Sequence, residues 1–174
     1  MKKNVLVFGI ISGLIAAFTV LTSIEMGYSN MWVGYGGMIV AFSLIFAGIK
    51  NLRDKFNGGF ISFGKAFKTG LLIALIGSTI YVAAWMIDYY SFHPDYMQKY
   101  AASVINEAKA SGASPAEIKK EKAQMATYIE MYKNPLMIMV FTYLEILPVG
   151  LIIALIAALM LKRKPVNPQA AAAA

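Results

Sequence analysis

Residues 136–161 read LMIMVFTYLEILPVGLIIALIAALML, and this stretch decides the fold class. Glu145 is its only charged residue. A hydrocarbon core roughly 30 Å thick needs about 20 apolar residues in helical form, because in lipid every backbone polar group must be bonded within its own segment. Residues 136–161 therefore predict a membrane-spanning helix.

Three further apolar stretches, residues 5–23, 32–49 and 70–87, meet the same criterion. The composition agrees, since 59% of the 174 residues are hydrophobic, 14% are charged and the mean hydropathy is +0.61. The absence of cysteine excludes disulfide frameworks and cysteine-ligated metal sites. We predict an all-α integral membrane protein with four transmembrane helices in a single domain, residues 1–164, followed by a disordered Ala-rich tail, residues 165–174.

The charges predict an orientation for these helices. The flanks 1–4, 50–69 and 162–174 carry ten Lys and Arg residues and a single acid, Asp54. The opposite flanks, residues 24–31 and 88–135, carry seven acids and six Lys. Because basic flanks stay on the cytoplasmic side, both termini are expected in the cytoplasm. The inner-face bases expected to contact anionic lipid headgroups are Lys50, Arg53, Lys55, Lys65, Lys68, Lys162, Arg163 and Lys164. Lipid contact accounts for the net charge of +7, so nucleic-acid binding is not expected.

Residues 94–133 form the one sizeable polar segment and predict a helical hairpin outside the membrane. Gly112 offers a stop for a first helix. Ser114 and Glu117 then form a capping-box pattern with Pro115 between them, which predicts the start of a second helix. The apolar side of this hairpin could pack on its neighbour, on the membrane surface or on a partner protein.

Small residues recur every fourth position in three of the four predicted spans and favour close helix packing in lipid. The helix-packing candidates are Gly9, Gly13, Gly70, Ala74, Gly150 and Ala154. These positions are interpreted as the seams of a four-helix bundle, with homodimer faces as the alternative.

Two short motifs lose their usual chemistry in this context. Residues 59–65 match the first seven positions of a phosphate-binding P-loop, but Ala66 replaces the Ser or Thr that would bind magnesium. Residues 93–95, His-Pro-Asp, repeat a J-domain tripeptide without the rest of that domain. A metal site at His93 would need three further ligands. We therefore expect no metal and no cofactor.

Acids within or beside the spans are the main candidates for a functional site. Glu145 lies about ten residues into the last span, and an ionisable group at that depth is a functional hypothesis by default. Tyr143, Asp88 and Glu25 complete a candidate intramembrane site for a proton or a small solute. In the alternative, Glu145 stays protonated and hydrogen-bonded inside the bundle, where it fixes the helix order, and Glu25 and Asp88 are ordinary interfacial groups.

The stretch GFISFGKAFKTG, residues 59–70, resembles the most recognisable segment of an uncharacterised bacterial family, domain of unknown function four-one-nine-nine. The layout of that family is similar, with about four membrane helices, a basic inner loop and a polar segment before the last helix. The resemblance implies a multi-pass protein of a bacterial inner membrane. It implies no activity and no functional residue.

Two classes of function remain open. No nucleophile, base and orienting group share a defined spacing, so an enzyme is not expected. The first class is a non-enzymatic structural or accessory membrane component that contacts another membrane protein or a second copy of itself. The second class is a small proton- or solute-translocating protein that uses Glu145.

Overall fold

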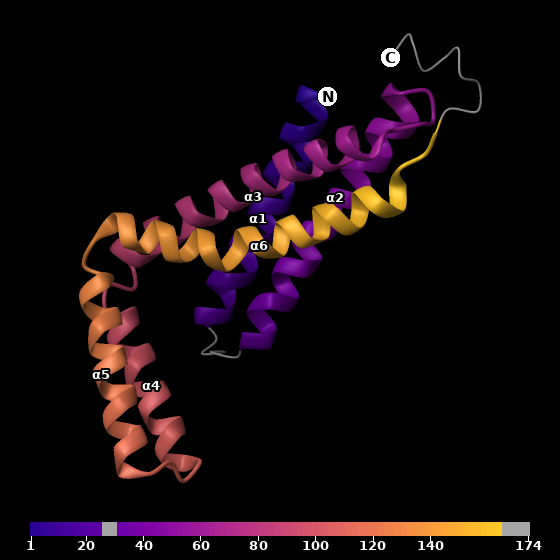
Figure 1. The fold of residues 1–174 in the computed structure, drawn as a ribbon. Coiled ribbons are helices and arrows are strands. Elements are labelled where there is room, and N and C mark those ends of the chain that lie inside the picture. Colours follow the sequence, from indigo (N-terminus) through magenta and orange to yellow (C-terminus); the bar gives the residue numbers. More distant parts are fainter. Residues whose placement is uncertain (26–30, 165–174) are drawn as a thin grey trace. The chain divides into compact units, whose positions relative to one another are not determined.

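The computed structural model describes residues 1–25 and 31–164, and the predicted Ala-rich tail lies outside the described residues. Its six helices are α1 (Lys2–Glu25), α2 (Met31–Phe56), α3 (Phe63–Ser91), α4 (Tyr96–Ala110), α5 (Pro115–Met131) and α6 (Pro135–Leu161) (Figure 1). Helices α1, α2, α3 and α6 are long and apolar enough to cross a membrane. The predicted all-α class with four membrane helices is confirmed, and the protein is a multi-pass membrane protein.

The membrane helices extend past the predicted spans, mostly at their charged ends. Helix α2 continues to Phe56 instead of ending at Ile49, and α3 begins at Phe63 instead of Gly70. A helix needs only its backbone hydrogen bonds to continue, and long Lys and Arg side chains can keep their charges in water while their stems cover apolar surface. Charged residues therefore end the hydrophobic stretch without ending the helix.

The chain forms two compact units, each described here by itself. The first unit contains residues 1–84 and the chain from Tyr143 onward, and the second contains Trp85–Thr142. Helices α3 and α6 contribute residues to both units.

In the first unit, α1 packs on α3 through glycine. A Cβ atom on Gly9 would lie 2.8 Å from Cβ of Ile76, and one on Gly13 would lie 2.8 Å from the backbone oxygen of Gly77. Such distances are shorter than van der Waals contact, so the two helix backbones approach as closely as they do because side chains are missing.

Helices α3 and α6 meet in the same way. A Cβ on Gly70 would lie 2.9 Å from Cβ of Ala154, and one on Gly150 would lie 2.8 Å from Cβ of Ala74. The ring of Phe42 on α2 is fully buried and lies against Gly150 and Gly77. Large side chains from α2 therefore fill the space that small residues on α3 and α6 leave open.

The second unit contains the predicted helical hairpin, α4 and α5, which lie side by side in Figure 1. Within the hairpin, the buried residues are Met97 and Ala101 on α4 and Met125 on α5. Gly112 adopts φ +79° in the turn, a conformation that suits glycine. Aromatic side chains also pack together in the second unit. The ring centroids lie 4.8 Å apart for Trp85 and Tyr96 and 5.8 Å apart for Tyr89 and Tyr132, and the rings of Tyr128 and Phe141 are also in contact.

The start of α5 has the predicted capping box. The side-chain oxygen of Ser114 accepts from the backbone N–H of Glu117, and the Glu117 carboxylate accepts from the backbone N–H of Ser114 at 2.7 Å. Pro115 occupies the first turn, where its missing N–H needs no partner. The hairpin thus carries its own start and stop signals.

Candidate functional site

The intramembrane carboxyl, Glu145, lies on the exposed side of α6. Gly150 and Ala154 face α3, and helical geometry places Glu145 about 140° around the axis from Gly150. Within residues 1–25 and 31–164, Glu145 has no hydrogen bond and no ion pair. The structure therefore does not place this carboxyl in a hydrogen-bonded position inside the bundle.

Tyr143 lies on the other side of α6. Its hydroxyl is 2.8 Å from Oγ1 of Thr79 on α3, an interaction that either atom can donate. Two residues along a helix are separated by about 200°, so Tyr143 and Glu145 point in nearly opposite directions. The two residues do not form one site.

Asp88 belongs to the second unit and pairs with a histidine. Its Oδ2 is 2.8 Å from Nδ1 of His93, and its backbone oxygen accepts from the N–H groups of Phe92 and His93. These contacts close the turn that ends α3. The side chain of Glu25, the last member of the predicted site, lies outside the described residues. Within the described part of the chain, no group of three or more His, Asp or Glu side chains is placed to hold a metal ion.

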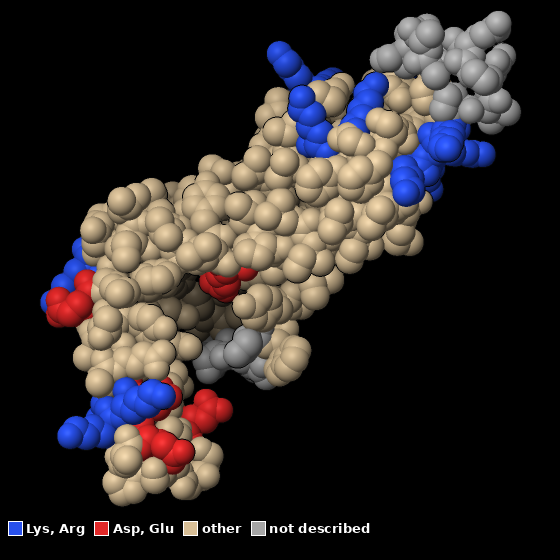
Figure 2. Space-filling model, viewed as in Figure 1, with Lys and Arg blue, Asp and Glu red and all other residues tan. Residues whose placement is uncertain are grey.

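The basic residues gather at one end of the first unit, where α1 and α3 begin and α2 and α6 end. Figure 2 shows Lys and Arg over this end and a mostly tan surface along the helices next to it. Its exposed bases are Lys2, Lys3, Lys50, Lys55, Lys68, Lys162, Arg163 and Lys164, and those half-buried are Arg53 and Lys65. We call this surface the basic end.

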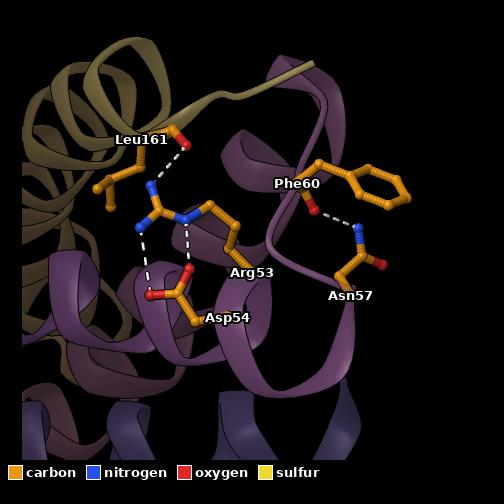
Figure 3. Close-up of polar contacts among 5 residues, drawn as sticks. All are labelled: Arg53, Asp54, Asn57, Phe60 and Leu161. Carbon is orange, nitrogen blue, oxygen red and sulfur yellow. Dashed lines mark hydrogen bonds and ion pairs between the residues drawn. The ribbon is translucent and has the colours of Figure 1, made fainter. Parts of the chain in front are cut away.

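Arg53 ties the end of α2 to the end of α6 (Figure 3). Its Nε and Nη2 donate to the two carboxylate oxygens of Asp54 at 2.6 and 3.2 Å, and its Nη1 donates to the backbone oxygen of Leu161 at 3.3 Å. The last carbonyls of a helix have no donor within the helix, so a guanidinium satisfies one of them here. Asp54 offsets part of the charge that this contact brings to the helix ends.

The loop between α2 and α3 pairs with the chain beyond α6. The backbone N–H of Ile61 donates to the oxygen of Arg163 at 3.0 Å, and the N–H of Arg163 donates to the oxygen of Ile61 at 2.9 Å. We call this pair of hydrogen bonds the loop bridge. Asn57 supports the loop, because its Nδ2 donates to the oxygen of Phe60 at 2.5 Å (Figure 3). Its Oδ1 accepts from Nζ of Lys65, also at 2.5 Å.

The start of α1 joins the same end through a buried amide. Asn4 is only 6% exposed, yet its Nδ2 donates to the backbone oxygen of Gly48 at 2.9 Å and its Oδ1 accepts from Nδ2 of Asn51 at 2.5 Å. A buried amide without partners is costly, so these bonds fix the position of α1 against α2.

A family model for a protein of unknown function (DUF4199) matches residues 7–163, which include all of α2 to α6. The chain belongs to this family. No curated protein and no solved structure matches it. Residues 59–70, within the matched range, contain the loop bridge residue Ile61 and the start of α3, so this segment forms part of the basic end.

Sequence reasoning assigned the charges of the DUF4199 basic end to lipid contact but missed its internal bonds. Asn4, Asn51 and Asn57 were not singled out, and Asp54 was counted only as the exception to the charge rule. Asparagines at the ends of apolar helices were the available signal, because a polar residue beside a bilayer needs a partner.

Proposed function

We propose that this DUF4199 protein is a non-enzymatic structural or accessory component of a bacterial inner membrane, and that its hairpin contacts another membrane protein or a second copy. The observation that carries the proposal is the connection between α3 and α6. Neighbouring antiparallel helices need only about 2–8 residues between them. Residues 92–134 instead form two helices with their own capping box and their own buried residues.

The hairpin supports a contact role because its two helices are well formed while most of their surface is exposed. It buries Met97, Ala101 and Met125, while most of its other side chains are exposed. A preformed helical pair presents its surface without the ordering entropy that a flexible loop would lose on binding.

The charges support an orientation with both termini in the cytoplasm and the hairpin outside. The basic end carries ten Lys and Arg residues against Asp54, and anionic lipid headgroups of the cytoplasmic leaflet attract such a surface. Single cysteines in this cysteine-free chain test the orientation. A cysteine at Lys120 on the hairpin should react with a membrane-impermeant maleimide in intact cells, and one at Lys55 should react only after lysis.

Deletion of residues 94–133, with a short Gly/Ser linker in their place, tests the contact role. The full chain, purified in mild detergent from its native membrane, should elute as a complex that the deletion variant does not form. A second variant keeps the hairpin and replaces the exposed Lys119, Lys120 and Lys122 with Glu. A complex of unchanged size and composition in both variants would refute a contact role for the hairpin.

The second candidate function is translocation of a proton or small solute, and the observation that favours it is the unpaired carboxyl of Glu145. Because this carboxyl lies on the exposed side of α6, a path that uses it would follow the outer face of that helix. Liposomes containing the purified chain, under an imposed pH gradient and membrane potential, should then show a flux that Glu145→Gln abolishes. Flux no greater than in empty liposomes would refute proton translocation.

A further inference from the structure

Glu145 lies on a face of α6 that is otherwise apolar. Leu144, Pro148, Ile152 and Ile156 are all exposed, and the last three lie about one, two and three turns beyond Glu145 on the same side of the helix. It lies ten residues from Pro135, the first residue of α6, which is about 15 Å along the helix and places the carboxyl well inside a hydrocarbon core roughly 30 Å thick.

Hydrocarbon gives this carboxyl nothing to bond. Ionisable groups in membrane helices almost always face a bundle interior, a water-filled cavity or a partner group, because isolation in lipid is costly. A second polar group lies beside it, since Pro148 has no N–H and the carbonyl of Leu144 therefore loses its usual helical donor. Two polar groups on one exposed face favour a hydrogen-bonding partner at the same depth.

The partner must supply a hydrogen-bonding group. If the partner is a second copy of this chain, that group is not a Lys or Arg side chain, because in the described part of the four membrane helices Lys and Arg occur only near the ends. A second copy in the same orientation does bring Glu145 itself, because a two-fold axis along the membrane normal places identical residues opposite each other. Two protonated carboxyls can each donate one hydrogen bond and accept one.

We infer that α6 packs against α6 of a second copy, with the two Glu145 carboxyls hydrogen-bonded across a two-fold axis. The apolar residues around Glu145 pack against each other but give little net attraction, because lipid tails are equally apolar. The carboxyl pair therefore supplies the specificity of the contact. The contact does not involve the hairpin, so it and the proposed hairpin function can fail independently.

Cysteine cross-linking tests the inference directly, because the chain has no cysteine of its own. Ile152→Cys places a thiol two turns from Glu145 on the same face, and Ile152 is 59% exposed. Ile11→Cys is the matched control, since Ile11 is 43% exposed on α1 and lies as far from the basic end of its helix as Ile152 does. Oxidation in membranes should give a disulfide-linked dimer of the Ile152→Cys chain and leave the Ile11→Cys chain monomeric.

Substitutions at Glu145 within the Ile152→Cys chain separate the carboxyl pair from simple proximity. Glu145→Gln should keep the cross-link, because an amide also donates and accepts. Glu145→Leu should lower the dimer association constant about tenfold, the loss expected for hydrogen bonds between membrane helices.

Three results would overturn the inference: an Ile152→Cys chain that stays monomeric, equal cross-linking of the Ile11→Cys control, or equal cross-linking in the Glu145→Leu chain. An adduct with a different protein at Ile152→Cys would also overturn it, because Glu145 would then meet a foreign partner.

Discussion

Replacement of Gly13 by Ala probes the close contact of α1 with the backbone of α3 in the first unit. The added Cβ would lie 2.7 Å from Cβ of Ile80 and 2.8 Å from the backbone oxygen of Gly77. Carbon atoms pack best at about 3.5–4.0 Å, so α1 and α3 have to separate by roughly half an ångström or more. The Gly77 oxygen belongs to the backbone and cannot rotate away.

The magnitude follows from two opposing effects. Overpacking of a tight contact costs about 1–3 kcal/mol, whereas Ala in a helix gains about 1 kcal/mol over Gly. Gly36→Ala in α2 is the matched control, because a Cβ at Gly36 meets no atom within 4 Å and shows only the helix-propensity gain. The free energy of unfolding of Gly13→Ala should therefore lie about 1–3 kcal/mol below that of Gly36→Ala.

Reversible unfolding in mixed micelles measures this difference. The fraction of SDS is raised and helix content is followed by circular dichroism, with the free energy extrapolated linearly as for other denaturants. If Gly13→Ala proves as stable as Gly36→Ala, the close packing of α1 on α3 is refuted.

Three further outcomes are expected. Arg163→Pro removes one of the two N–H groups of the loop bridge and should lower the free energy of unfolding by about 1 kcal/mol in the same assay. Arg163→Ala keeps both hydrogen bonds and should change the free energy little. Equal effects of the two substitutions would contradict the loop bridge. Ser114→Ala should speed amide exchange in the first turn of α5, corresponding to about 1 kcal/mol, and Ser111→Ala should not. The Ser114 hydroxyl and backbone N–H lower the pKa of Glu117 below its ordinary value of 4.5, so the capping box should be intact above pH 4.5 and weaken as the pH falls through the lowered pKa. NMR shifts of this turn that do not change in acid would show that the carboxylate does not cap it.

The number of membrane helices and the hairpin could be predicted because both depend on local sequence. Residues 136–161 are long and apolar enough on their own, and the capping box is complete within Ser114–Glu117. Helix ends were less predictable, since Lys50 and Lys68 end an apolar run without breaking a helix. Hydropathy indicates which residues lie within the lipid, whereas the end of a helix depends on where its backbone hydrogen bonds stop.

The direction of Glu145 was harder to predict because α6 is apolar on every side. A helix without a polar face gives no periodicity from which to infer its buried side. Gly150 and Ala154 held the missing signal, since they mark the side that meets α3 and Glu145 lies about 140° from Gly150. The partners of Asn4 and Arg53 could not be predicted, because each depends on atoms far away in the chain.

The loop bridge and Arg53 also set an order of assembly during translation. Arg53 reaches Leu161 across 108 positions of sequence, and Ile61 pairs with Arg163, so neither bond can form until the last helix has left the ribosome. A nascent chain holding only the first three membrane helices therefore keeps a guanidinium and a loop peptide without their final partners. Synthesis of α6 and of the residues after it thus completes the contacts of the basic end.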